Sequence, residues 1–203
     1  VRVLEEPSQD YAIERDALIV LMLYACGLRR SELASLQVDS LDLRAGTLRV
    51  MGKGSKERIL PVLPEIVRRL EYYLQLRETE NSCGKAGNSL FLTNKGAPIT
   101  DQGIYRIVRE YLGAVGVQGK RSPHVLRHTF ATHLMQHGAS VRTVQQLLGH
   151  ASLAATQVYT HNTIESLKDI YRKAPPREKH YTTSYLFILF QGGPLMISPI
   201  QSV

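Results

Sequence analysis

The sequence lacks the features that would place it among disulfide-rich, metal-binding or membrane proteins. Its two cysteines, Cys26 and Cys83, are too few and too far apart for a disulfide framework or a cysteine metal site. No apolar run reaches about 18 residues, and no secretory signal peptide is present. We therefore expect a cytoplasmic protein without a membrane span.

Negative charge is missing from one long window. No Asp or Glu occurs in residues 111–164, although the chain has 18 acidic residues. The window holds six of the seven histidines together with Lys120, Arg121, Arg127 and Arg142. The net charge is +7 and the pI is near 9.5. Such an uncompensated positive field favours a polyanion, and nucleic acid is the expected partner.

Periodicity and capping residues predict one mainly α domain with a small antiparallel β-sheet (α+β). The chain has 203 residues and is 43% hydrophobic, which suffices for one core. Two strands around the Gly-rich turn 52–57 predict a hairpin, 47–51 with 58–62, and 90–92 is a candidate third strand. Ser31 is expected to cap a short helix. Further helices are expected at 11–25, 64–79, 100–115, 123–137, 141–148, 152–160 and 163–174.

The segment after Ser122 has the features of an anion site. Ser122 and Pro123 are typical of the N-cap and first position of a helix. His124 and Arg127 are three residues apart, so both side chains leave one face of its first turn. Unpaired N–H groups and the positive end of the helix dipole favour an anion there.

Five sequence blocks form a recognisable series: YACGLRRSEL (24–33), GKGSKER (52–58), SPHVLRHTFATHL (122–134), LLGH (147–150) and QVYTH (157–161). Together they resemble the catalytic domain of the tyrosine site-specific recombinases of the phage integrase family, most closely the Xer type. They occur in the family's order, and the likeness extends over about residues 10–175. The resemblance implies the recombinase catalytic-domain fold and site-specific cleavage and rejoining of DNA strands.

The resemblance also implies a catalytic set. Its members are Arg29, Lys53, His124, Arg127, His150 and Tyr159. Arginine forks stay charged and suit the non-bridging oxygens of a phosphodiester, and the tyrosine is the implied nucleophile of a 3′-phosphotyrosyl intermediate. The lysine would protonate the leaving 5′-oxygen. His124 would exchange the tyrosine proton, and His150 would donate a hydrogen bond to the phosphate.

The expected partner is double-stranded DNA, with self-association as a tetramer on DNA in the full-length protein. No cofactor and no metal is expected. The DNA contacts predicted outside the catalytic set are Lys56, Arg58, Lys120, Arg121 and Arg142. Residues 1–178 are assigned to the catalytic domain. Because the chain opens at Val1, we expect it to be a fragment without the family's N-terminal core-binding domain. Residues 179–203 match nothing in the family and are expected to form an atypical tail.

Simpler interpretations compete with these assignments. Lys53 has a rival in Lys56, and either lysine could be a solvated turn residue. Tyr171 is a nearby competitor for the nucleophile, but it belongs to an amphipathic helix. Arg30 is expected at the surface, and Glu32 is expected to be structural, orienting a neighbouring arginine.

Alternatives also exist at the level of the site and of the whole function. His128, His133 and His137 lack a further zinc ligand at a recognisable spacing. Among whole functions, a non-catalytic DNA-binding module and a type IB topoisomerase remain. The biological role, chromosome dimer resolution or integration, stays open.

Overall fold

The computed structural model describes residues 6–52, 57–80 and 87–149. The helices predicted at 152–160 and 163–174, and the tail, lie outside the described residues. Among the described residues, no helix combines the length and apolarity needed to cross a bilayer. The elements, in chain order, are α2 (Tyr11–Ala25), α3 (Arg30–Ala34), the 3-10 helix η1 (Val38–Ser40), β1 (Leu41–Asp42), β2 (Thr47–Met51), β3 (Glu57–Pro61), α4 (Pro64–Glu80), α5 (Asp101–Ala114), α6 (Pro123–Gln136) and α7 (Val141–Leu148).

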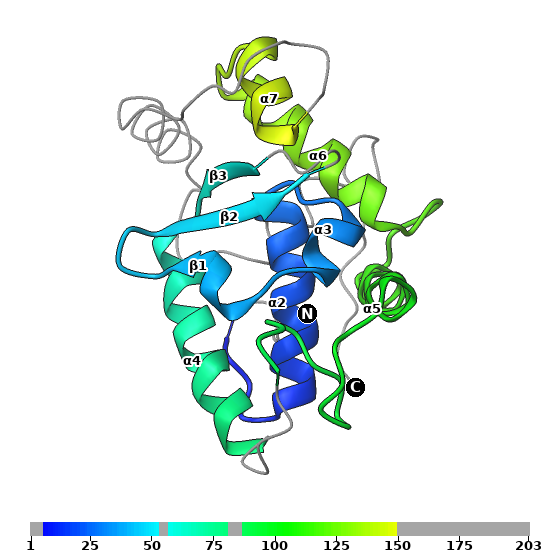
Figure 1. Ribbon diagram of the computed structural model, residues 1–203. Helices are drawn as coiled ribbons and strands as arrows, with labels where there is room; N and C mark the ends of the chain where they lie inside the picture. Colours follow the sequence, from blue (N-terminus) through cyan, green and yellow to red (C-terminus); the bar gives the residue numbers. More distant parts are fainter. Residues whose placement is uncertain (1–5, 53–56, 81–86, 150–203) are drawn as a thin grey trace.

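Helix α2 is the central element of the fold. Asp10 caps its first turn, where its side chain accepts a hydrogen bond from the Ile13 amide. The helix is buried on most sides, and it contacts α4, α5 and α6 (Figure 1). Apolar residues around most of its circumference therefore form the middle of the core.

The end of α2 is fixed by a close approach between two chain segments. Gly27 has φ +59°, and a Cβ at this position would lie 2.3 Å from the Phe130 ring of α6. Gly27, the glycine predicted to end this helix, is therefore required for two reasons. It adopts a left-handed backbone conformation, and it has no side chain that would collide with Phe130. This contact brings the start of α3 next to α6.

The sheet is a three-stranded antiparallel meander in the order β1-β2-β3. Leu41 pairs with Leu48, and Met51 pairs with Glu57. Leu48 and Val50 are buried on the core side of β2, which is the alternation expected of a half-buried strand. The predicted hairpin is confirmed, although β1 was not predicted. Its tip, residues 53–56, lies outside the described residues.

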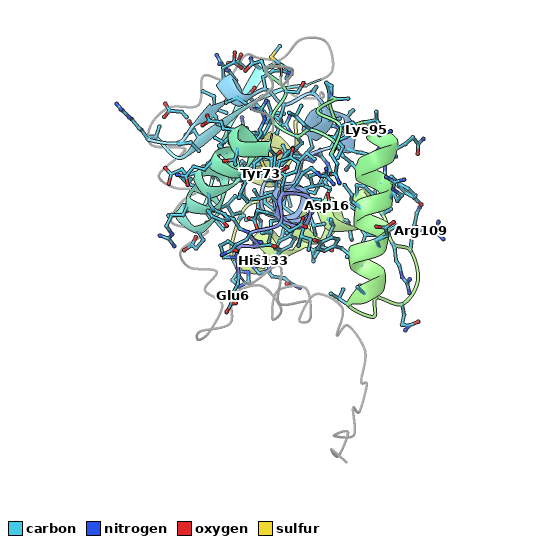
Figure 2. All side chains as sticks on the ribbon, turned by 90° about the horizontal axis from the view of Figure 1, so that it is seen from below. Glu6, Asp16, Tyr73, Lys95, Arg109 and His133 are labelled. Atoms are coloured by element: carbon cyan, nitrogen blue, oxygen red, sulfur yellow. The ribbon has the colours of Figure 1, made fainter. Side chains whose placement is uncertain are left out.

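A buried aromatic group joins α2, α4 and the segment 87–92. The Tyr11 and Tyr73 rings stack with centroids 5.7 Å apart, and the Tyr73 hydroxyl donates to the Leu90 carbonyl. Figure 2 shows Tyr73 among the packed side chains at the centre, whereas Arg109 lies on the outer side of α5. The strand predicted at 90–92 is wrong, because this apolar segment is held by tyrosine hydroxyls and an isolated bridge between Leu92 and Pro98.

The remaining helices agree with prediction to within a few residues, but two caps differ. The N-cap of α3 is Arg29 rather than Ser31, and the helix is only five residues long. Ser122 occupies the N-cap of α6 without a side-chain cap bond. By contrast, the Ser140 side chain caps α7 by accepting a hydrogen bond from the Thr143 amide. Gly149 ends the helix with φ +65°.

Candidate active site

A buried glutamate at the start of α3 holds the first predicted catalytic arginine. The Glu32 side chain is 4% exposed, and its Oε2 accepts the Arg29 amide at 2.8 Å. Its Oε1 accepts Arg29 Nη1 at 2.7 Å. The carboxylate thus caps the helix that begins at Arg30 and also orients the Arg29 guanidinium, in agreement with the prediction for Glu32.

The same carboxylate contacts two further arginines. Arg58 donates through Nη1 to Oε1 at 2.9 Å and through Nη2 to Oε2 at 2.8 Å. Arg127 Nη1 lies 3.8 Å from Oε2. Burial raises the pKa of Glu32, but the hydrogen bonds from Arg58 and Arg29 outweigh it and lower the pKa to about 2. Glu32 is therefore ionised at neutral pH, with three arginines around it.

The three arginines also cap the end of α7. Arg58 Nε donates to the Leu147 carbonyl at 2.9 Å, and Arg29 Nη2 donates to the Gly149 carbonyl at 3.3 Å. Arg127 Nη2 donates to the Leu148 carbonyl between them. These carbonyls have no partner inside the helix, and they carry the negative end of its dipole. Three successive carbonyls therefore each meet a different guanidinium.

Arg127 joins α6 to the end of α2 as well. Its Nη1 donates to the Gly27 carbonyl, which the close approach of Phe130 to Gly27 brings within reach. Burial and the neighbouring Arg29 lower the pKa of Arg127 to about 10. This guanidinium is still charged at neutral pH, and it is held more rigidly than a surface arginine.

A small pocket of about 60 Å³ brings three of the predicted catalytic residues together. Among the described residues, no acidic side chain lines it. His124 is exposed at its rim, in the first turn of α6, where the dipole favours an anion. The lining residues are Leu28, Arg29, Arg30, Tyr105, Pro123, His124 and Arg127.

Arg30 was expected at the surface, and its side chain is 35% exposed while it also lines this pocket. Its Nε donates to Asp101 Oδ2 at 3.1 Å, and its guanidinium lies 5.9 Å from the Tyr105 ring centroid. No sequence signal pointed to Tyr105, because its partner Arg30 lies on another helix. Asp101, at the start of α5, could have suggested an acidic partner for Arg29 or Arg30.

The predicted DNA contacts separate into exposed and buried residues. Lys120 and Arg142 are exposed, and Arg121 is half-buried with its Nε donating to the Val117 carbonyl at 2.9 Å. The prediction for Arg58 needs correction, because its side chain is 7% exposed and bonded to Glu32 and Leu147. A guanidinium enclosed in this way does not reach a DNA backbone.

Four predicted site residues lie outside the described residues. They are Lys53, Lys56, His150 and Tyr159. Of the histidines weighed for zinc, His133 and His137 stack with ring centroids 4.2 Å apart, and His137 Nδ1 lies 2.9 Å from the His133 carbonyl. Within the described part of the chain, no cluster of three or more potential metal ligands occurs.

Comparison with known proteins decides the family. The sequence pattern described as the phage integrase family matches residues 2–166. The chain belongs to the phage integrase family. The family assignment agrees with the blocks that contain Arg29, His124 and Arg127.

Two curated tyrosine recombinases are similar to this chain over most of its length. It is 42% identical over 182 residues to tyrosine recombinase XerC of Thermodesulfovibrio yellowstonii, covering 88% of this chain and 60% of that one. It is 44% identical over 177 residues to tyrosine recombinase XerD of Proteus mirabilis, covering 86% and 56%. The chain therefore spans less than two thirds of the length of either relative.

Solved structures agree on the fold. The XerA recombinase crystal structure is 34% identical, with a TM-score of 0.65, covering 87% of this chain and 63% of that one. The XerH site-specific recombinase, in a post-cleavage complex with palindromic difH substrate, is 29% identical, with a TM-score of 0.63, covering 84% and 50%. The predicted fold, a mainly α recombinase catalytic domain with a small antiparallel sheet, is confirmed.

Proposed function

We propose that this chain is the catalytic part of a site-specific DNA recombinase that cleaves and rejoins strands through a 3′-phosphotyrosyl intermediate. The observation that carries the proposal is the pocket between α3 and α6. It gathers Arg29, His124 and Arg127 from segments about 100 residues apart, and no acidic side chain among the described residues lines it. The XerC, XerD and XerH relatives, the last bound to its substrate, support the same reaction.

The two arginines bind the scissile phosphate in this mechanism. Their planar forks contact its non-bridging oxygens, where negative charge gathers during in-line attack. Glu32 holds Arg29 in place before DNA arrives, and the Gly27 carbonyl holds Arg127. This preorganisation lowers the cost of ordering the side chains when the transition state forms.

The chemical step exchanges one P–O bond for another. The Tyr159 phenolic oxygen forms a bond to phosphorus, and the bond from phosphorus to the 5′-oxygen breaks. His124 accepts the tyrosine proton, and Lys53 gives a proton to the 5′-oxygen as it leaves. His150 donates a hydrogen bond to the phosphate. The reverse sequence rejoins the strand, with the free 5′-hydroxyl as nucleophile.

Duplex DNA and further copies of the protein are the proposed partners. Lys56, Lys120, Arg121 and Arg142 contact phosphates around the cleavage position. The exposure of Lys120 and Arg142 in the described structure is compatible with this role. Exchange of strands between two duplexes calls for four active sites, so the full-length protein acts as a tetramer on DNA.

The proposed function is tested with a nicked suicide substrate that traps covalent protein–DNA adducts. The wild-type chain and Tyr171→Phe are expected to form an adduct that survives denaturation, because Tyr171 has no role in the reaction. Tyr159→Phe is expected to bind DNA but form no adduct, since it has lost the attacking oxygen. An adduct in Tyr159→Phe, or none in the wild type, would contradict the proposal. Relaxation of supercoils without pairing of sites would indicate a topoisomerase instead.

A further inference from the structure

Arg58 is a buried cation beside the candidate active site that the proposed reaction does not use. Its side chain is 7% exposed, and it does not line the pocket between α3 and α6. All three of its nitrogens donate, two to Glu32 and one to the Leu147 carbonyl. A buried charge is costly unless it is fully paired, so this arrangement calls for a specific reason.

The contacts of Arg58 join three elements. The residue lies on β3, the Glu32 carboxylate belongs to α3, and the Leu147 carbonyl is at the end of α7. Its guanidinium also lies against the turn that ends α7, because a Cβ on Gly149 would be 3.2 Å from Nη1. Arg58 therefore fixes the sheet, the first catalytic arginine and the α7 terminus relative to one another.

The link to Arg29 runs through one shared atom. Glu32 Oε1 accepts Arg58 Nη1 at 2.9 Å and Arg29 Nη1 at 2.7 Å. With Arg58 removed, each carboxylate oxygen loses a donor, and the carboxylate is free to turn toward the remaining cations. Arg29 would then lose the fixed support that points its other nitrogen at the Gly149 carbonyl.

We propose that Arg58 is a positioning residue, which holds Glu32 and the end of α7 so that Arg29 and Arg127 meet the phosphate in the right geometry. The inference rests on the proposed function for its effect on the reaction. The fork is essential, because its three separate nitrogens hold the two carboxylate oxygens and the carbonyl at fixed positions, whereas an ammonium presents all its donors on one atom. Arg58 touches no reacting atom.

A matched control exists at the other end of α2. Arg69 has an equally buried side chain, 7% exposed, and it binds both oxygens of the buried Glu14. Glu14 lies in the first turn of α2, on the order of 20 Å along the helix from its end at the pocket. Arg69→Met therefore breaks a comparable ion pair without touching the site.

The first experiment measures single-turnover cleavage of a suicide substrate at saturating protein, along with DNA affinity and thermal stability. Arg58→Met is expected to lower the cleavage rate on the order of 10²-fold, the cost of a small misplacement, with little change in affinity. Arg69→Met is expected to lose comparable stability but keep its rate. Arg58→Lys, which retains the charge, is expected to remain defective. Full rescue by lysine, or equal rates for the two Met variants, would overturn the proposal.

A double-mutant cycle tests whether Arg58 acts through Glu32. If it does, Arg58→Met adds little to the defect of Glu32→Gln, since both remove the same support. Additive defects would overturn the link. A pH profile adds a readout that simple destabilisation does not move. Glu32 without Arg58 has a raised pKa, so cleavage by Arg58→Met is expected to fall with acid at a pH where wild type and Arg69→Met stay active.

Crystal structures separate this inference from the proposed function. In Arg58→Met, the Arg29 side chain is expected to leave Glu32 Oε1 and the Gly149 carbonyl; an unmoved Arg29 would overturn the positioning role whether or not the chain cleaves DNA. Absence of an adduct in the wild type would instead count against the proposed function. If Arg58→Met fails to fold, the same comparison is made with Arg58→Lys.

Discussion

At the scale of single residues, Glu32 is the anion that the arginines of the candidate site share. Its carboxylate neutralises part of the positive charge of Arg29, Arg58 and Arg127, which would otherwise repel one another in a buried cluster. Glu32 itself does not line the pocket, whereas Arg29 and Arg127 do. In the proposed mechanism, this carboxylate would orient Arg29 and Arg127 without occupying the place of the phosphate.

Glu32 also gives the fold a specific acid sensitivity. Its pKa is about 2 in the folded protein, against 4.5 for an ordinary glutamate. The stabilisation is therefore complete above pH 4.5 and is lost as the pH falls from 4.5 toward 2. Urea unfolding of wild type and Glu32→Gln is expected to give a stability difference that shrinks across this range. A difference that stays constant from pH 5 to pH 3 would contradict the pKa assignment.

The contrast between Arg29 and Arg58 shows what sequence can say about a residue. Arg29, His124 and Arg127 were predicted as site residues from motif blocks, and the structure brings them into one pocket. Arg58, which follows the turn with Lys53 and Lys56, was predicted as a DNA contact. Local charge gave no information about Glu32 or Leu147, whose contacts with Arg58 arise only from tertiary packing.

At the scale of elements, capping and periodicity predicted most helices, because those signals are local. Asp10, Thr100 and Ser140 cap α2, α5 and α7 through their own side chains. The start of α3 was misplaced because its N-terminal amide is satisfied by Glu32, three residues later, and not by Ser31. The apolar segment 90–92 is held by tyrosines of α2 and α4, whose hydroxyls donate to its carbonyls. A sequence pattern alone cannot distinguish such a buried segment from a strand.

The turn between α2 and α3 makes a prediction about stability. Gly27→Ala is expected to destabilise the chain by roughly 2–5 kcal/mol, from a left-handed backbone and a clash with the buried Phe130 ring. Gly116→Ala is the matched control, because Gly116 has φ +76° with nothing within 4 Å of the added carbon. It is expected to cost only roughly 1–2 kcal/mol. Urea unfolding of both variants checks this, and equal losses would contradict the close approach.

At the scale of the whole molecule, charge is distributed so that one end is selectively basic. The acid-free window includes all of α6 and α7, which lie together at one end of the fold (Figure 1). The sheet and its turns carry charges of both signs, with Asp39, Asp42 and Glu57 beside Arg44 and Arg49. A polyanion is therefore attracted to the end of the molecule that holds the pocket.

This distribution predicts a steep salt dependence for DNA binding. Each neutralised phosphate contributes roughly 0.9 to the slope of log affinity against log salt. Arg142→Ala is expected to reduce that slope by about 0.9. Arg44→Ala, an exposed arginine in the β1–β2 turn outside the window, is expected to leave it unchanged. Titrations at several salt concentrations check this, and a salt-independent affinity would contradict nucleic-acid binding altogether.

The central claim, covalent attachment of DNA through Tyr159, is tested most directly by locating the bond. The trapped adduct is digested, and mass spectrometry identifies the modified peptide and the end of the DNA strand attached to it. The account predicts a 3′-phosphoryl group on Tyr159 and a free 5′-hydroxyl on the released strand. A 5′-phosphoryl linkage, or attachment to any other residue, would contradict it.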